Sequence, residues 1–211
     1  ALLYRYSGQA RFAVGTPVAN RPRRELDGVV GCFVNTLAIP AQLDGEQPFA
    51  GLLGQVHDAL RGALAHQALP FEQLIQALGV ERSLDRAPLV QVLLALQGEA
   101  TDAAPALSGL EVTPAAVSPA TAMFELTLQV IDGAGGLHGH LEYNSDLFER
   151  STVERLLTHL ERLLGAVVAD PSLAVGRVAL LSDTEREAQL AASTGAVVPV
   201  SAGCVHELIE A

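Results

Sequence analysis

The sequence predicts an α/β protein of the α+β sandwich type, in which helices back a mixed β-sheet, and three patterns predict this class. Apolar residues recur with helical spacing across residues 49–64 and 156–167. Apolar and polar residues alternate across residues 124–130 and 137–143, as in strands with one buried face. Residues 29–37 form a nearly continuous apolar run, which is typical of a strand covered on both faces. A chain of 211 residues, 49% of them hydrophobic, can bury the core that such a fold needs.

The apolar run VVGCFVNTL (29–37) is predicted to be the central buried strand, because a turn signal precedes it and a proline follows it. Asn35 and Thr36 place two polar side chains where this strand emerges. Hydrogen bonding to a neighbouring loop would explain such a pair, and a functional role at the strand end stays open.

The segments before this strand begin with a helical turn. Residues 1–7 are typical of the last turn of a helix that Gly8 ends, and a strand is predicted over residues 11–19. The loop over residues 20–28 contains three arginines, at positions 21, 23 and 24. We expect them either to pair in solvent with Glu25 and Asp27, or to guide an anionic group.

Two helices and another strand are predicted after the central strand. The first helix runs from about residue 49 to His66 and carries an apolar face that would lie on the sheet. Pro70 suits the start of the second helix, and Gly79 ends it. A buried strand is predicted over residues 89–97, followed by a long connection to about residue 121 with a weak strand at 110–112.

The second half of the chain is predicted to contain a hairpin and two helices. Residues 133–136 join the two alternating segments as a turn. Ser151 and Glu154 predict a capping box for a long amphipathic helix that ends at residues 170–171, and Ser182 and Glu185 repeat that device for a short helix. Residues 191–203 have the composition of a linker.

The charge balance excludes several classes of partner. All 13 basic residues are arginine, and 24 acidic residues give a net charge of −11, so we expect no nucleic acid and no anionic membrane as partners. No apolar run reaches the roughly 20 residues of a membrane span, and no export signal begins the chain, so we expect a cytoplasmic location. Cys32, in the predicted buried strand, and Cys204 are expected to be reduced thiols. Because the sequence contains no lysine, it excludes a phosphate-binding loop of the Walker type and Schiff-base chemistry.

No catalytic or metal-binding constellation emerges from the residues alone. His138, His140 and Glu142 would lie on one strand face opposite the leucines, where solvated side chains are expected and not a metal site. No Gly-x-Ser-x-Gly elbow is present, and the glycines at 133–136 are typical of a hairpin turn.

Three segments carry a resemblance to a known family. They are Gly31-Cys32-Phe33-Val34-Asn35-Thr36, His66-Gln67-x-x-Pro70-Phe71-Glu72 and Arg82-x-x-x-Arg86-x-Pro88-Leu89. In order and spacing they resemble successive core motifs of the condensation domains of nonribosomal peptide synthetases. GTPVANR (15–21) and LEYNSDLF (141–148) are similar to the family as well, so the resemblance covers about residues 1–180.

The chain also departs from the family pattern. Ala68 stands where the family usually has Asp, Pro40 where an Arg is usual, and the Arg82 motif carries Ser83, Asp85 and Ala87 in place of Asp, Ser and Asn. The family's His-His-x-x-x-Asp-Gly motif belongs to the N-terminal half of the domain, and the chain has no adjacent pair of histidines. No catalytic residue is therefore expected within this chain.

The resemblance implies a chloramphenicol-acetyltransferase-like fold of two lobes with a tunnel between them. Residues 1–180 would be the C-terminal lobe without its N-terminal lobe, residues 181–203 an interdomain linker, and residues 204–211 the start of an adenylation domain. Both ends would then be internal to a longer polypeptide. Gly31, Phe33, Asn35 and Thr36 would lie near the tunnel, the loop at 15–31 would form its floor, and residues 98–122 would be a latch that reaches the other lobe. The resemblance also implies a structural role for residues of the other two motifs, which are His66, Gln67, Pro70, Phe71, Glu72, Arg82, Arg86 and Pro88.

The reaction that the resemblance implies is amide-bond formation. A donor aminoacyl or peptidyl thioester and an acceptor amine would arrive on the phosphopantetheine arms of two peptidyl carrier domains, and no cofactor would bind the lobe directly. The arginine loop could then guide the phosphate of such an arm. The alternatives are a catalytically inactive, condensation-like recruitment domain and a module that binds carrier proteins without catalysis. The Phe-Val-Asn-Thr and His-Gln-x-x-Pro-Phe-Glu forms argue against epimerization and cyclization domains.

Overall fold

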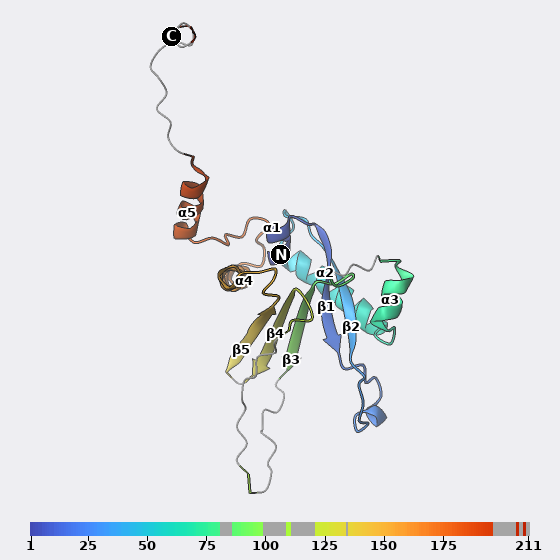
Figure 1. Ribbon diagram of the computed structural model, residues 1–211. Helices are drawn as coiled ribbons and strands as arrows, with labels where there is room; N and C mark the ends of the chain where they lie inside the picture. Colours follow the sequence, from blue (N-terminus) through green and yellow to red (C-terminus); the bar gives the residue numbers. More distant parts are fainter. Residues whose placement is uncertain are drawn as a thin grey trace. The chain divides into compact units, whose positions relative to one another are not determined.

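The structure, a computed structural model, describes residues 1–80, 86–98, 109–110, 121–133 and 135–195 together with His206 and Ile209. The chain divides into two compact units, residues 1–178 and residues 179–211. The first unit is a mixed five-stranded sheet with helices, which confirms the predicted class (Figure 1).

The first unit contains, in chain order, α1 (Leu2–Ser7), β1 (Arg11–Val18), a short 3-10 helix η1 (Arg24–Leu26), β2 (Asn35–Gln42), α2 (Phe49–Ala65), α3 (Phe71–Ala77), β3 (Val92–Gly98), β4 (Leu126–Gly133), β5 (Gly136–Tyr143) and α4 (Arg150–Ala169). The second unit contains α5 (Asp183–Ser193), whose N-terminus has the predicted capping box of Ser182 and Glu185. Gly8 follows α1 with a left-handed backbone (φ 70°), as expected for a glycine that ends a helix.

The strands are ordered β2-β1-β3-β4-β5 across the sheet. β1 pairs antiparallel with β2 and parallel with β3, β3 pairs parallel with β4, and β4 forms the predicted hairpin with β5. Because β2 lies at the edge, the helices that follow it, α2 and α3, pack against an edge strand. Leu37 and Ile39 of β2 are buried.

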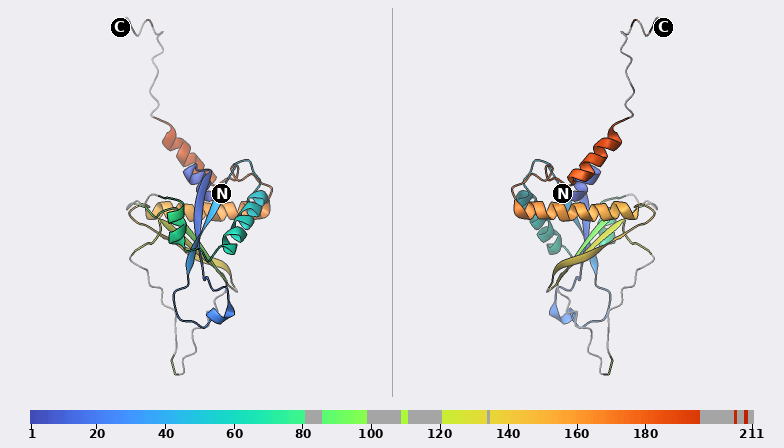
Figure 2. Two further views of the ribbon diagram at one scale, coloured as in Figure 1. Left: turned by 90° about the vertical axis from the view of Figure 1, so that its right-hand side faces the viewer. Right: turned by 90° about the vertical axis from the view of Figure 1, so that its left-hand side faces the viewer.

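The longest helix, α4, lies crosswise to the strands in both side views (Figure 2). It buries one apolar stripe that includes a histidine: Val153, Leu156, His159, Leu163 and Val167. Leu163 and Val167 were predicted to face inward and do so, whereas Leu164 of the same predicted stripe is exposed. The helix therefore presents a narrower apolar face than the sequence pattern suggests.

The start of α2 is held by the segment that follows α4. The N–H groups of Phe49 and Ala50 donate to the carbonyl oxygens of Leu173 (2.9 Å) and Pro171 (3.0 Å). These bonds satisfy helix N-terminal donors that Pro48, at the N-cap, leaves without a side-chain cap. Beside this junction Leu43, Leu52 and Val175 form a small core cluster. Leu53, Val56, Leu60 and Leu64 of α2 remain exposed, although the sequence pattern places them on the helix face that would lie on the sheet.

The prediction of a central strand over residues 29–37 is wrong in both place and extent, because β2 lies at the edge of the sheet. β2 begins at Asn35, and Val29, Val30, Cys32 and Val34 are exposed. The physical reason is the register of the sheet: β1 ends at Val18, which is the partner of Asn35, so residues 29–34 have no neighbouring strand to pair with. An apolar run without a partner strand stays a loop.

The predicted capping box of Ser151 and Glu154 is also wrong. α4 already begins at Arg150, with Glu149 at the N-cap and no side-chain cap. The Glu154 carboxylate instead accepts from Arg150 Nε at 2.7 Å, an i,i+4 ion pair on the exposed face. Ser151 lies within the first turn, where it cannot act as the cap.

Several expectations fall outside the described residues. Arg82 and Cys204 are among these, as are residues 111–112 of the predicted weak strand and most of the connection at 98–122. Within the part of the chain that the structure describes, no helix is long and apolar enough to cross a membrane, and no cluster of His, Cys, Asp or Glu could hold a metal ion.

Candidate functional site

The first residue of β2, Asn35, connects two segments that are far apart in the sequence. Its Nδ2 donates to the carbonyl oxygens of Gln67 (2.9 Å) and Leu69 (2.8 Å). Its Oδ1 accepts from the N–H groups of Thr36 (3.0 Å) and Phe71 (3.1 Å). A primary amide has two N–H donors and an oxygen that accepts two bonds, so this side chain uses its full hydrogen-bonding capacity.

The bond to Phe71 gives Asn35 a further role at the start of α3. Pro70 is the N-cap of this helix and provides no side-chain cap, so the first N–H groups of α3 need an acceptor from elsewhere. Asn35 supplies one of these acceptors from across the strand end. The turn between α2 and α3, to which Asn35 is bonded, has a hydrogen bond of its own: the N–H of Leu69 donates to the carbonyl oxygen of His66 at 3.0 Å. The Asn35 side chain is therefore structural in the first instance, as the strand-end interpretation expects.

An open hollow of about 260 Å³ lies beside this junction. It is lined by Asn20, Val34, Asn35, Thr36, Ala68, Pro70, Phe71 and Glu72. Its polar groups are amides, a hydroxyl and one carboxylate, a set that can hold and orient a polar group. The described lining of the hollow contains neither a histidine nor a cysteine.

The structure brings together half of the site residues that the sequence singled out. Asn35, Thr36, Pro70, Phe71 and Glu72 meet at the hollow, and Gln67 joins them through its main-chain carbonyl. His66 occupies the C-cap position of α2, and its side chain is exposed. Gly31 and Phe33 belong to the loop that leads into Asn35, whereas Arg86 is exposed and Pro88 lies in the turn before β3.

One polar pair, in which a buried histidine meets an exposed tyrosine, was not predicted from the sequence. The hydroxyl of Tyr6 on α1 lies 2.6 Å from His159 Nδ1 on α4, and the two rings are 5.8 Å apart between centroids. His159 is only 3% exposed. The signal that could have found it is its position three residues after Leu156 and four before Leu163, within the apolar stripe of the helix.

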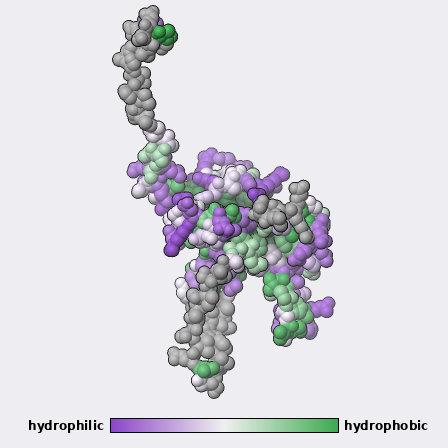
Figure 3. All heavy atoms as spheres, in the orientation of Figure 1, coloured by the Kyte–Doolittle hydropathy of each residue, from purple (hydrophilic) through white to green (hydrophobic). Residues whose placement is uncertain are grey.

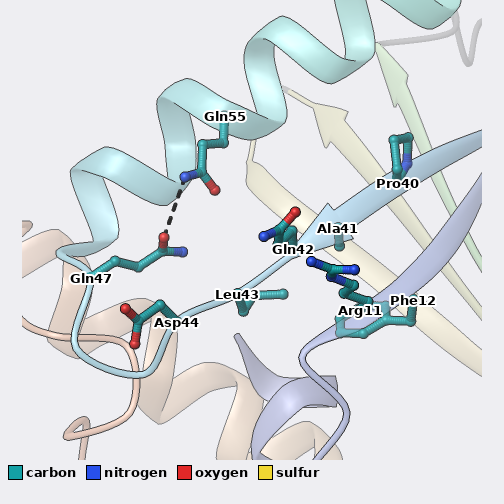
Figure 4. Close-up of a pocket in the computed structure, with 9 residues that line it drawn as sticks. All are labelled: Arg11, Phe12, Pro40, Ala41, Gln42, Leu43, Asp44, Gln47 and Gln55. Atoms are coloured by element: carbon teal, nitrogen blue, oxygen red, sulfur yellow. Dashed lines mark hydrogen bonds between the residues drawn. The ribbon is translucent and has the colours of Figure 1, made fainter.

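A second, larger hollow of about 710 Å³ lies between the ends of β1 and β2 and the first turns of α2 (Figure 4). Gln55 Nε2 donates to Gln47 Oε1 across it at 3.4 Å, and Arg11 and Gln42 contribute further polar groups to its wall. None of the motif residues lines this hollow, so it is separate from the Asn35 junction.

The sequence matches a family of known proteins. The family described as the condensation domain matches residues 1–190. The chain is 42% identical over 211 residues to a linear gramicidin synthase of Brevibacillus parabrevis, a match that covers 99% of this chain and 3% of that protein. It is 37% identical over 187 residues to a plipastatin synthase of Bacillus subtilis, a match that covers 88% of this chain and 5% of that protein. The chain thus spans only a few per cent of the length of these relatives.

Solved structures agree with this assignment. A four-domain nonribosomal peptide synthetase bound to AMP and glycine matches with a TM-score of 0.74 and 27% identity, over 88% of this chain and 15% of that chain. The X-domain in its complex with OxyB, from teicoplanin biosynthesis, matches with a TM-score of 0.75 and 27% identity, over 86% of this chain and 40% of that chain. The fold is therefore chloramphenicol-acetyltransferase-like. The chain belongs to the condensation domain family of nonribosomal peptide synthetases.

Proposed function

We propose that this chain is part of a condensation domain that forms the amide bond between a donor aminoacyl or peptidyl thioester and an acceptor amine. The amine nitrogen attacks the thioester carbonyl carbon, the new C–N bond forms and the C–S bond breaks. The donor thiol leaves with the proton that the amine gives up. Both substrates would be carried on the phosphopantetheine arms of peptidyl carrier domains, which are therefore the expected partners.

We further propose that residues 1–180 are the C-terminal lobe of that domain, that residues 181–203 are a linker, and that residues 204–211 begin an adenylation domain. The sequence contains no adjacent pair of histidines, so the His-His-x-x-x-Asp-Gly motif would come from a companion N-terminal lobe. In this proposal the present chain contributes the wall of the tunnel and no proton transfer. Gly31, Phe33, Asn35 and Thr36 would shape that wall, and the residues of the two other motifs would support it.

The Asn35 junction is the observation that carries the proposal. Three of its four hydrogen bonds tie the Gly31–Thr36 motif to the His66–Glu72 motif, so two of the segments that resemble the family form one local structure. Such a junction fixes the shape of the adjacent hollow, and small displacements of groups that position a substrate are costly to a reaction rate.

The test is amide formation by the synthetase module that carries this chain. With both carriers loaded, mass spectrometry of the acceptor carrier should detect the dipeptidyl product in the wild type. Asn35→Ala should lower the rate by tens of fold, because the lost bonds are worth on the order of 1–3 kcal/mol. Gln73→Ala, which removes an exposed amide from the same α3 helix, is the matched control and should leave the rate unchanged. A rate unchanged by Asn35→Ala, at unchanged thermal stability, would contradict the proposal.

A second candidate, a recruitment domain without catalysis, rests on the likeness to the X-domain solved in its complex with OxyB. The same assay separates the two. A wild-type module that binds both carriers but yields no dipeptidyl product would favour recruitment.

A further inference from the structure

The segment between β1 and β2 is a loop whose apolar residues face outward. We call residues 19–34 the projecting loop, because they extend beyond the paired strands (Figure 1). Val29, Val30 and Val34 are 44%, 101% and 64% exposed, and Figure 3 shows apolar atoms gathered on this projection. Strand pairing between β1 and β2 ends at the pair Val18 and Asn35, so no hydrogen bonds between these two strands hold the loop beyond that pair.

One side chain, Arg21, spans the base of the projecting loop. Its Nη1 donates to the carbonyl oxygen of Leu26, and its Nη2 to that of Gly31 at 3.4 Å. Its Cζ lies 4.2 Å from the centroid of the Phe33 ring. A guanidinium is planar and carries several donors, so it can stack on a ring and bind carbonyl oxygens at the same time.

The positions of Arg21 and Phe33 show that their contact closes the base of the projecting loop. Arg21 lies three residues after the end of β1, and Phe33 lies two residues before the start of β2. Their stacking therefore joins the outgoing and returning arms of the loop just beyond the last strand pair. Neither expectation for the arginines included a contact of Arg21 with main-chain carbonyls and an aromatic ring.

The two neighbouring arginines provide a contrast within the same loop. The side chains of Arg23 and Arg24 are exposed, whereas Arg21 is half-buried. Arg24 is at the start of the 3-10 helix η1, which is held by main-chain bonds from Leu26 N–H to Arg23 O (3.0 Å) and from Asp27 N–H to Arg24 O (3.1 Å). Removing either exposed side chain leaves these bonds in place.

We propose that Arg21 is a positioning residue, which holds the projecting loop in one shape and thereby fixes the approach of Phe33 to Asn35. Val34 and Asn35 line the hollow beside the α3 helix, so the backbone that Phe33 anchors runs directly into its wall. Loss of the Arg21 side chain would free the returning arm of the projecting loop and make the position of Val34 and Asn35 in the wall of the hollow less well defined. The effect on the loop is independent of the reaction, whereas the effect on turnover rests on the proposed amide-forming function.

Hydrogen exchange measured by mass spectrometry on the 211-residue chain tests the effect on the loop. Arg21→Ala should speed exchange of the amides of residues 26–33 by about tenfold, with no change in the β4–β5 hairpin. Arg21→Lys should give a smaller increase, because an ammonium can stack on Phe33 but cannot bind both carbonyls in the same way. Arg23→Ala and Arg24→Ala should exchange like the wild type. Equal exchange in wild type and Arg21→Ala would overturn the inference.

Turnover by the synthetase module tests the consequence for the site. Arg21→Ala should lower dipeptidyl formation about tenfold, mainly in kcat, with partial rescue by Arg21→Lys. Loop opening without a change in rate would overturn the positioning role. A wild-type module that makes no amide would reject the proposed function alone, because the exchange measurement still decides whether Arg21 holds the loop.

Discussion

Gly15 on β1 occupies a place where no side chain fits. A Cβ at this position would lie 2.7 Å from Val90 Cγ1 and 3.0 Å from Leu93 Cδ1. Val90 is completely buried, and its turn is fixed by a 2.8 Å bond from Gln91 Nε2 to the carbonyl of Ala87. The missing side chain therefore lets the segment before β3 pack directly on β1.

Gly15→Ala should consequently destabilise the fold by about 1–3 kcal/mol, because neither neighbour can move without opening the packing. Chemical denaturation monitored by circular dichroism measures this free energy of unfolding. Gly51→Ala on α2 is the matched control, since a Cβ there meets nothing within 4 Å. It should stabilise the helix by up to about 1 kcal/mol. Equal stability of the two variants would show that Val90 does not pack on Gly15.

At this scale the sequence predicts which residues matter better than what they contact. Asn35 and Thr36 stand out as polar residues after an apolar run, but three of the four partners of Asn35 lie 32 to 36 residues away. Those partners are main-chain groups, which every residue type possesses. The role of Arg21 could not be predicted from the sequence for a similar reason. Its partners are an aromatic ring and two main-chain carbonyls, which produce no charge pattern in the sequence.

Among the elements, those set by local pattern were predicted well. α2 and the β4–β5 hairpin form where the apolar spacing places them. The errors occur where a boundary depends on a distant partner: residues 29–34 lack a neighbouring strand, and α4 begins one residue before Ser151. Local spacing cannot reveal either condition.

The turn that ends α4 offers a prediction about pH. Asp170 is the C-cap, and its Oδ1 accepts from the hydroxyl of Ser172 (2.6 Å) and from the N–H of Ser172 (2.9 Å). These bonds favour the ionised form and lower the pKa of Asp170 below its ordinary value. A lowered pKa in the folded state means that the contribution of Asp170 to stability is present above its ordinary pKa and is lost as the pH falls through the lower pKa of the folded state.

Ser172→Ala should raise the pKa of Asp170 toward its ordinary value, because the hydroxyl bond is the larger cause of the shift. An NMR titration of the Asp170 carboxyl carbon measures this directly. Ser151→Ala, which removes a serine hydroxyl at the opposite end of α4, is the control and should leave that titration unchanged. An unchanged pKa in Ser172→Ala would mean that the turn does not hold the carboxylate.

For the whole molecule, the fold class follows from the sequence, but the order of the strands does not. β3 lies between β1 and β4, so it pairs with strands from both halves of the unit. Such parallel pairings are set by long-range packing and leave no local signature. The family assignment came instead from the spacing of whole motifs, and the match over residues 1–190 bears it out.

The central claim is that this chain shapes an amide-forming site but does not perform the reaction by itself. The most direct measurement is the intact mass of the acceptor carrier after incubation with the loaded donor carrier. The synthetase module that carries this chain should convert the aminoacyl carrier to the dipeptidyl form, and the 211-residue chain alone should leave it unchanged, because it contains no His-His pair to act on the amine. Dipeptidyl product from the chain alone, or none from a module that binds both carriers, would contradict the account.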